Sequence, residues 1–185
     1  ADRVVASRAR YPSASRDGRY LMFNVLGDRP GRWEPAWIDL PADGTVPRLG
    51  KAHIGGRFPT ISPDGRLVLY MSAETGRDEV FVTRFPSGRD KWQVSTDGGG
   101  WAGWGSGGTE ILYRRGGRQS TLMSDAVTGD PEPRFGAPRA LFAWNEHWAP
   151  YFAWTHDGTR GLTAVPAGPV RHVESLRVIR QWAPR

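Results

Sequence analysis

One short pattern occurs four times along the chain, and this repetition constrains the fold more than any other feature of the sequence. The copies align without a gap: YPSASRDGRYLMF at 11–23, FPTISPDGRLVLY at 58–70, WAGWGSGGTEILY at 101–113 and YFAWTHDGTRGLT at 151–163. Each copy begins with an aromatic residue, passes through a turn and continues in an apolar run. The chain is therefore built from four similar supersecondary units.

Each copy contains a pair of residues that favours a tight reversal of the chain. The pairs are Asp17-Gly18, Asp64-Gly65, Gly107-Gly108 and Asp157-Gly158. Glycine adopts positive φ without steric penalty, and aspartate can hydrogen-bond the backbone just ahead of it. We therefore expect two antiparallel strands around each pair and a structural role for these turn residues.

Further apolar runs follow each hairpin. A third strand is expected at 34–40, 78–85, 120–127 and 174–182, and a shorter fourth strand closes each of the first three repeats, as at 91–95 and 138–142. Four strands in a repeat of about 40 to 50 residues are typical of a β-propeller blade. The sequence thus predicts an all-β fold, a propeller of four four-stranded blades. It predicts a single domain over 1–185, with blades at about 8–54, 55–97, 98–145 and 146–185 plus 1–7.

The N-terminal segment has the position of an outer strand without a blade of its own. Val4 lies seven residues before Tyr11. Val94, in the last strand expected for the second blade, lies seven residues before Trp101 in the same way. The last repeat lacks a fourth run before Arg185. Because pairing would remove two exposed sheet edges, we expect residues 3–7 to complete the last blade, either within one chain or between two copies.

Composition agrees with an all-β chain of many turns. The 24 glycines and 15 prolines exceed a fifth of the 185 residues, which argues against long helices. Sheets arranged around an axis leave wedges that need bulky side chains. We expect tryptophan to fill them: Trp37, Trp92, Trp101, Trp104, Trp154 and Trp182. Trp33 and Trp148 fall in predicted loops and could instead stack on a sugar.

The second repeat, FPTISPDGRLVLYMSAETGRDEVFVTRFP, resembles the WD-like propeller repeats of TolB-type proteins. KWQVSTDGG and FGAPRALF are similar to the propeller regions that follow the kinase domain of many bacterial serine/threonine kinases. The resemblance extends over nearly all of 3–182. It implies a propeller that binds partners, usually without catalysis of its own, and a periplasmic or secreted location.

The chain departs from that family in two ways. Gly107 replaces the aspartate of the third turn, which weakens that turn. Four repeats are present where six or more are usual. A small four-bladed ring, a half-ring that pairs with itself and a piece of a longer chain all remain open.

The sequence offers no pattern typical of a catalytic or metal site. It has no cysteine, its four histidines have no i, i+4 pairing, and no kinase motif of the D-F-G or H-R-D type occurs. Gly98 to Gly108 have the G-x-G-x-x-G spacing twice, but we expect a strand after them and not a phosphate-binding helix. We predict no enzyme activity, no cofactor, no metal and no membrane span. Nucleic-acid binding is not expected either, because no basic run occurs.

Charge points to one end of the predicted propeller. The chain carries a net +6, and Lys51 and Lys91 are the two lysines, so arginine supplies 23 of the 25 basic residues. Loops between blades, together with loops between second and third strands, share one rim with eleven basic and six acidic residues. The opposite rim, which holds the turns, has four basic and seven acidic residues. We therefore expect the first rim to attract acidic ligands.

Two functions from different classes follow. The first is a non-catalytic propeller for protein interaction, scaffolding or self-assembly, either stand-alone or as the sensor region of a larger bacterial protein. The alternative is a carbohydrate-binding propeller that uses tryptophan and arginine on its rim. The candidate binding residues are Arg10, Arg32, Trp33, Arg57, Arg77, Arg114, Arg115 and Trp148. The expected partner is a protein or a second copy of the chain, or an acidic or glycan ligand.

Overall fold

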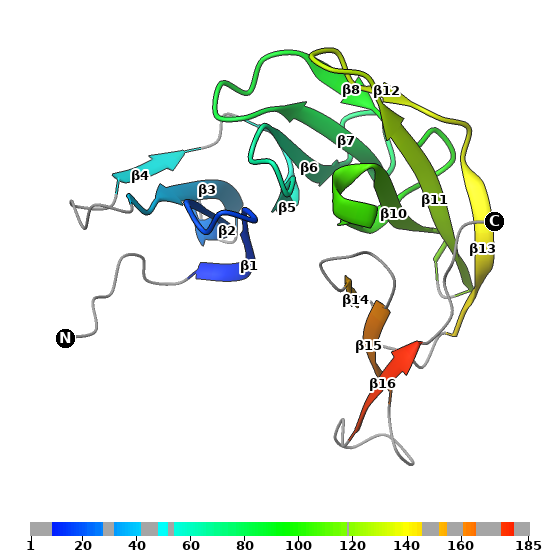
Figure 1. Ribbon diagram of the computed structural model, residues 1–185. Helices are drawn as coiled ribbons and strands as arrows, with labels where there is room; N and C mark the ends of the chain where they lie inside the picture. Colours follow the sequence, from blue (N-terminus) through cyan, green and yellow to red (C-terminus); the bar gives the residue numbers. More distant parts are fainter. Residues whose placement is uncertain are drawn as a thin grey trace. The chain divides into compact units, whose positions relative to one another are not determined.

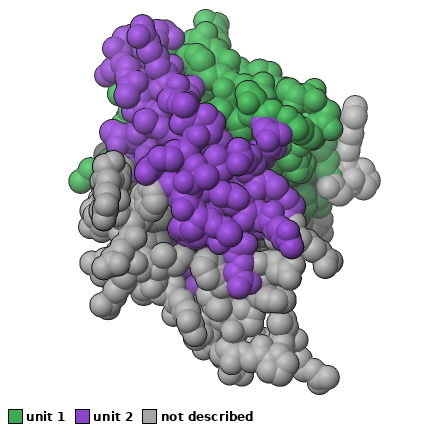
Figure 2. Space-filling view, turned by 90° about the vertical axis from the view of Figure 1, so that its right-hand side faces the viewer, with its two compact units in different colours: residues 1–96 green, residues 97–185 purple. Residues whose placement is uncertain are grey.

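The computed structural model describes residues 9–27, 32–41, 48–51, 54–117, 119–145, 152–154, 161–165 and 175–179. The chain divides into two compact units, unit 1 (residues 1–96) and unit 2 (residues 97–185), which Figure 2 colours separately. Apart from one turn of 3-10 helix, every element in the described part is a β-strand. The prediction of an all-β chain is confirmed in the described part, and the boundary between the units follows Thr96 in the sequence.

Unit 1 consists of two four-stranded antiparallel sheets (Figure 1). The first contains β1 (Ala9–Ala14), β2 (Tyr20–Leu26), β3 (Trp33–Asp39) and β4 (Arg48–Lys51), in that order. The second contains β5 (Arg57–Ile61), β6 (Leu67–Ser72), β7 (Glu79–Arg84) and β8 (Lys91–Gln93). Each sheet is a simple up-and-down meander, as the repeat predicts. The expected third strands lie within one residue of β3 and β7.

The two sheets of unit 1 pack through apolar side chains that alternate along their strands. Met22 from the first sheet forms a buried cluster with Ile61 and Val68 from the second. Trp37 lies opposite Met22 in the β2–β3 register, and its ring packs edge-on against Phe85, 5.4 Å between centroids. Trp37 therefore fills the space between sheets, as predicted for it.

The turns of the first two repeats contain the same hydrogen-bond network. Ser15 Oγ donates to Asp17 Oδ1 at 2.6 Å and accepts from the Tyr20 N–H at 2.9 Å. Asp17 Oδ1 also accepts from the Arg19 N–H, at 3.0 Å. These bonds, first the one from Ser15, lower the pKa of Asp17. Gly18 closes the turn at φ +72.

Ser62, Asp64, Gly65 and Leu67 repeat this arrangement with the same Ser–Asp distance of 2.6 Å. Burial raises the pKa of Asp64, but hydrogen bonds from Ser62 and Arg66 outweigh it, so the pKa is lowered. The structural role predicted for the Asp-Gly pairs is thus confirmed in unit 1. The serine two positions earlier is part of the motif, which the sequence analysis missed.

Unit 2 has a five-stranded sheet and a three-stranded sheet in its described part. The first contains β9 (Gly100–Gly105), β10 (Glu110–Arg115), β11 (Ser120–Thr128), β12 (Arg134–Phe135) and β13 (Arg139–Trp144). The second contains β14 (Phe152–Trp154), β15 (Gly161–Val165) and β16 (Ser175–Ile179). Leu112, Leu122 and Trp144 form a buried core that Phe152 joins from β14, so these sheets also pack through apolar residues.

One local prediction for the third repeat, the number of strands in its sheet, is wrong. Its sheet has five strands and not four, because the long β11 pairs with β12 near one end and with β13 over the rest of the same edge. The Gly107-Gly108 turn is a 3-10 helix over Ser106–Gly108, with Gly107 at φ 68 and Gly108 at φ 100. Gly105 and Gly107 stand where the first two repeats have serine and aspartate, so the side-chain network cannot form.

Several predicted features lie outside the described residues. They are the closing strand at 3–7, the turn at Asp157-Gly158, and the side chains of Trp148, Trp154 and Trp182. The number of blades in the ring therefore stays a prediction. Of the other expected wedge residues, Trp104 is buried and Trp92 and Trp101 are partly buried.

The aromatic residue that opens each of the first three repeats has an unusual backbone. Tyr11, Phe58 and Trp101 have φ of 56, 55 and 51, in the left-handed region that large side chains avoid. Each of their strands shifts register beside this residue, as a β-bulge does. The Phe58 N–H leaves the ladder and donates to Asn24 Oδ1 at 3.0 Å. The sequence analysis found the aromatic repeat but not its conformation.

Unit 2 buries a carboxylic acid without a hydrogen-bond partner. Asp125 on β11 is 0% exposed, and neither carboxylate oxygen has a partner in the described structure. Burial raises the pKa of Asp125 from 3.8 to about 6. Because the raised pKa belongs to the folded state, folding is penalised only where the group ionises, so this penalty grows as pH rises from about 4 to about 6.

Replacing Gly18 with alanine tests the turn geometry. A Cβ at Gly18 meets nothing within 4 Å, so only the positive φ opposes it. We expect Gly18→Ala to lower the free energy of unfolding by about 1 kcal/mol. Gly55→Ala is the matched control, since Gly55 has equal space and no positive φ. Equal urea-unfolding midpoints for the two variants would contradict the strained turn.

Replacing Asp125 with asparagine removes the ionisable group. We expect Asp125→Asn to exceed the wild type in unfolding free energy at pH 7 by up to about 3 kcal/mol, at about 1.36 kcal/mol per pKa unit, with no such gain at pH 4. Thermal melts across this range measure it, with the exposed Asp130→Asn as control. A variant that is less stable than the wild type at pH 7 and equal to it at pH 4 would refute this burial penalty.

Candidate functional site

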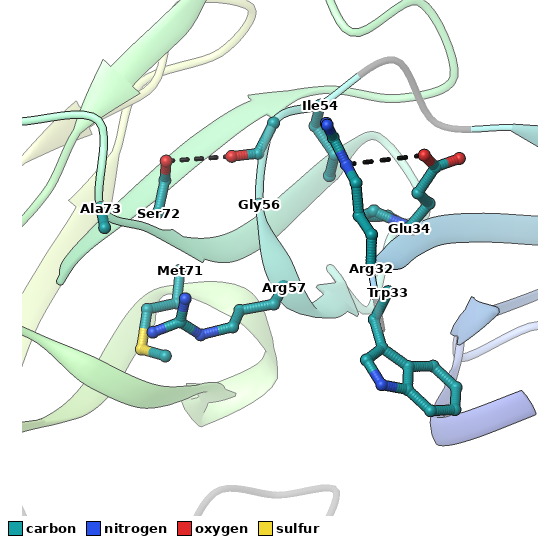
Figure 3. A pocket seen from close by; sticks show the side chains of 11 residues that line it. Arg32, Trp33, Glu34, Ile54, Gly56, Arg57, Met71, Ser72 and Ala73 are labelled. Carbon is teal, nitrogen blue, oxygen red and sulfur yellow. Dashed lines mark hydrogen bonds and ion pairs between the residues drawn. The ribbon is translucent and has the colours of Figure 1, made fainter. Parts of the chain in front are cut away.

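The described pocket lies in unit 1 at the rim where the two sheets meet. Its volume is about 320 Å³, and Arg32–Pro35, Ile54–Arg57 and Met71–Ala73 line it. These segments come from the start of β3, the approach to β5 and the end of β6. The two kinds of loop predicted to share a rim therefore do so within unit 1. Three predicted binding residues, Arg32, Trp33 and Arg57, line this pocket (Figure 3).

A fourth predicted residue, Arg10, joins them from β1. Its guanidinium carbon lies 4.4 Å from the centroid of the Trp33 ring, a cation–π contact. No carboxylate of the described residues pairs with Arg10. We call Arg10, Arg32, Trp33 and Arg57, with the pocket beside them, the rim site.

Cationic groups outnumber carboxylates at the rim site. Arg32 Nε is 3.6 Å from Glu34 Oε1, and Lys51 Nζ approaches the same carboxylate at 3.9 Å. Arg57 Nη2 lies 2.7 Å from both carboxylate oxygens of Asp78. With Arg10, four cations thus face two carboxylates. The pairs are solvent-exposed and worth little on their own, so the surplus positive charge is available to a ligand.

The wall of the pocket is held by close packing. A Cβ at Gly56 would lie 2.2 Å from the Tyr70 ring, so only glycine fits there. Tyr70 stacks on Phe81 with 5.8 Å between centroids, and burial raises the pKa of its hydroxyl. Ser72 Oγ donates to the Gly55 carbonyl at 3.0 Å. In Figure 3 the Arg57 side chain extends towards Met71, whereas the Trp33 indole points away from both.

An aromatic pair adjoins the rim site. Tyr11 and Phe58, which follow Arg10 and Arg57 directly in the chain, meet edge to face with 4.8 Å between ring centroids. Tyr11 is 45% exposed. The bulges of β1 and β5 thus place two rings next to two arginines, an arrangement that suits a peptide with apolar and acidic side chains.

The structure does not bring the other predicted binding residues to this site. Arg77 holds the buried Glu79, at 2.8 Å, and donates to the Thr96 carbonyl, which is a structural role. Arg114 and Arg115 belong to unit 2. Arg114 donates to Ser120 Oγ at 2.9 and 2.7 Å, and burial lowers its pKa. Trp148 lies outside the described residues.

Arginines pair with carboxylates beside the turns of unit 1, and the acidic character of the opposite rim stays a prediction. Arg19 and Arg48 both pair with the buried Asp39, at 3.3 and 3.2 Å, and their hydrogen bonds, Arg19 first, lower its pKa. Arg66 pairs with Asp64 at 2.7 Å. These arginines flank the turns, and the sequence analysis counted only the residues inside them.

The described residues offer no candidate for a metal centre or for a membrane-spanning helix. No group of three or more histidine, aspartate or glutamate side chains is placed to hold a metal in the described residues. The same part of the chain contains no helix long and apolar enough to cross a membrane.

Comparison with known proteins gives no match to a protein family or to a curated protein. Solved structures do match. TolB from Acinetobacter baumannii has a TM-score of 0.64 at 16% identity, over 85% of this chain and 38% of that chain. A putative TolB from Agrobacterium tumefaciens has a TM-score of 0.55 at 17% identity, over 78% of this chain and 53% of that chain. The β-propeller domain of the Trilobed protease from Pyrococcus furiosus has a TM-score of 0.54 at 16% identity, over 94% of this chain and 51% of that chain.

These likenesses define the class of fold. The sheets are those of a TolB-like β-propeller, which confirms that part of the resemblance seen in the second repeat. At this identity the likeness shows the fold alone. The chain spans about half or less of the length of each of these structures.

Proposed function

We propose that this chain is a non-catalytic propeller module that binds an acidic segment of a protein partner at the rim site. The gathering of Arg10, Arg32, Trp33 and Arg57 around one pocket carries the proposal. Arg10 and Trp33 meet across the first sheet, and the packing of the second sheet against it adds Arg57, so residues distant in sequence come together. The surplus of cations would steer an acidic segment, and the exposed Tyr11 ring would take an apolar side chain.

The fold by itself does not select this function. Similar structures include an acylaminoacyl peptidase from Pyrococcus horikoshii and a putative 6-phosphogluconolactonase from Bacteroides uniformis. Function must therefore be argued from the site. The proposal extends to the biological setting: a module outside the cytoplasm, acting alone, as the sensor region of a larger bacterial protein, or by assembly with copies of itself.

A contact at the rim site favours a peptide over a sugar. Arg10 covers one face of the Trp33 ring, at 4.4 Å, which reduces the surface on which a sugar could stack. A guanidinium held in this way still presents its N–H groups to a carboxylate. The glycan-binding alternative therefore ranks second.

Labelled ten-residue peptides that combine Glu or Asp with Phe or Leu test the proposal by fluorescence anisotropy. We expect the full chain to bind some of them, and Arg10→Gln and Arg32→Gln each to weaken binding about 5- to 10-fold. Binding should also weaken between 50 and 300 mM NaCl, about the range in which exposed charges become screened. Arg89→Gln, an exposed residue beyond β7, is the matched control and should bind as the wild type.

Two results would contradict the proposed function. One is the absence of binding to every acidic peptide, and the other is an equal loss in the Arg89→Gln control. A glycan array with wild type and Trp33→Ala decides the alternative: sugar binding that Trp33→Ala abolishes, without peptide binding, would replace the peptide by a glycan.

A further inference from the structure

A buried amide with an unused donor lies next to the pocket. Asn24 on β2 is 1% exposed, and its Oδ1 accepts from the Phe58 N–H at 3.0 Å. Because a backbone N–H can only donate, this bond fixes which end of the amide faces Phe58. Asn24 Nδ2 then points elsewhere, and it has no hydrogen-bond partner in the described structure. A buried donor of this kind is destabilising until an acceptor reaches it.

The position of Asn24 connects this donor with the rim site. Across the sheet, Asn24 pairs with Arg10 on one side and with Pro35 on the other. Directly opposed residues of antiparallel strands project from the same face of the sheet. Pro35 lines the pocket, and Phe58 follows the lining residue Arg57. The unused donor therefore lies between a lining residue of each sheet.

The chemistry around Asn24 defines what would occupy the pocket. Asn24 is not itself a lining residue, so an acceptor oxygen has to reach its Nδ2 beside the lining residues Pro35 and Arg57. The cation surplus at Arg10 and Arg32 favours an oxygen that carries negative charge. Ile54 and Met71 offer apolar contact to a short hydrocarbon stem. A carboxylate on a short methylene chain meets all of these requirements.

We propose that the pocket is a specificity pocket for an acidic side chain of the bound peptide, and that Asn24 Nδ2 donates a hydrogen bond to its carboxylate. This inference rests on the proposed function and deepens it. Asn24 then has two roles. Its Oδ1 accepts the hydrogen bond from the Phe58 N–H at the bulge, and its Nδ2 donates to the carboxylate of the ligand.

NMR on the ¹⁵N-labelled full chain tests the inference without any substitution. The chain has two asparagines, Asn24 and Asn145, and three glutamines, so five side-chain amide pairs have to be assigned. We expect N-acetyl-glutamate N-methylamide to shift the Asn24 side-chain signals in a saturable way and to leave those of Asn145 in place. The neutral isostere N-acetyl-glutamine N-methylamide should bind at least 10-fold more weakly.

Asn24→Asp provides the matched variant. It keeps an oxygen for the Phe58 N–H and removes the donor, so we expect acidic peptides to bind at least 10-fold more weakly at pH 8. Because Asn24→Asp buries a carboxylate with a single hydrogen bond, we expect it to melt below the wild type at pH 8. Should it fail to fold, the NMR titration of the wild type decides.

Three outcomes would overturn the inference. They are an unmoved Asn24 signal at saturating acid, equal binding of the glutamine isostere, or binding of D-glucuronate without binding of the glutamate derivative. Acidic peptides that bind Asn24→Asp as tightly as wild type, yet lose affinity with Arg10→Gln, would also overturn it and leave the proposed function standing. If no acidic peptide binds at all, the proposed function fails first and the inference with it.

Discussion

The structure depends on the burial of one sheet face against the next sheet. A β-sheet with an apolar face cannot remain stable in water unless that face is covered. In unit 1 the cover for Met22 and Trp37 comes from Ile61, Val68 and Phe85 of the following repeat. In unit 2 Phe152 of β14 covers Leu112 and Leu122 in the same way. Repetition of the sequence is thus a physical requirement, since each repeat supplies what its neighbour lacks.

The same packing creates the candidate site. Two meanders that pack face to face bring the start of β3 beside the approach to β5, which places Arg32 and Trp33 near Arg57. The β-bulges add to this by turning Tyr11 and Phe58 towards each other. Asn24 connects the two sheets, because its side chain, buried in the first sheet, accepts a hydrogen bond from the Phe58 N–H at the bulge of the second. Residues at and beside the candidate site therefore also take part in the packing of the two sheets.

Much of the fold could be predicted because local sequence patterns determine the strands and turns. The apolar runs give the positions of β3 and β7 within one residue, and the aromatic residue at each repeat start is visible in the alignment. The five-stranded sheet could not be predicted, because two short strands share one edge of β11 by tertiary pairing. The 3-10 turn at Gly107 carried a partial signal, the loss of serine and aspartate from that repeat.

The site was predicted in part. Arg10, Arg32, Trp33 and Arg57 could be grouped from blade topology alone. Arg77 could not be separated from them, because its partner Glu79 lies in a strand and looks exposed in the sequence. Asn24 and Gly56 carry no signal at all, since one sits inside an apolar run and the other in an ordinary glycine pair. Their roles arise only from contacts between residues far apart in the chain.

A double-mutant cycle across the first two sheets tests this account most directly. Trp37 and Phe85 come from different repeats and meet edge-on, 5.4 Å between centroids. Trp37→Leu, Phe85→Leu and the double variant should reveal a favourable coupling of about 0.5–1.5 kcal/mol in urea unfolding. Strictly additive losses, with no coupling between the two rings, would contradict the claim that neighbouring repeats stabilise each other through their buried faces.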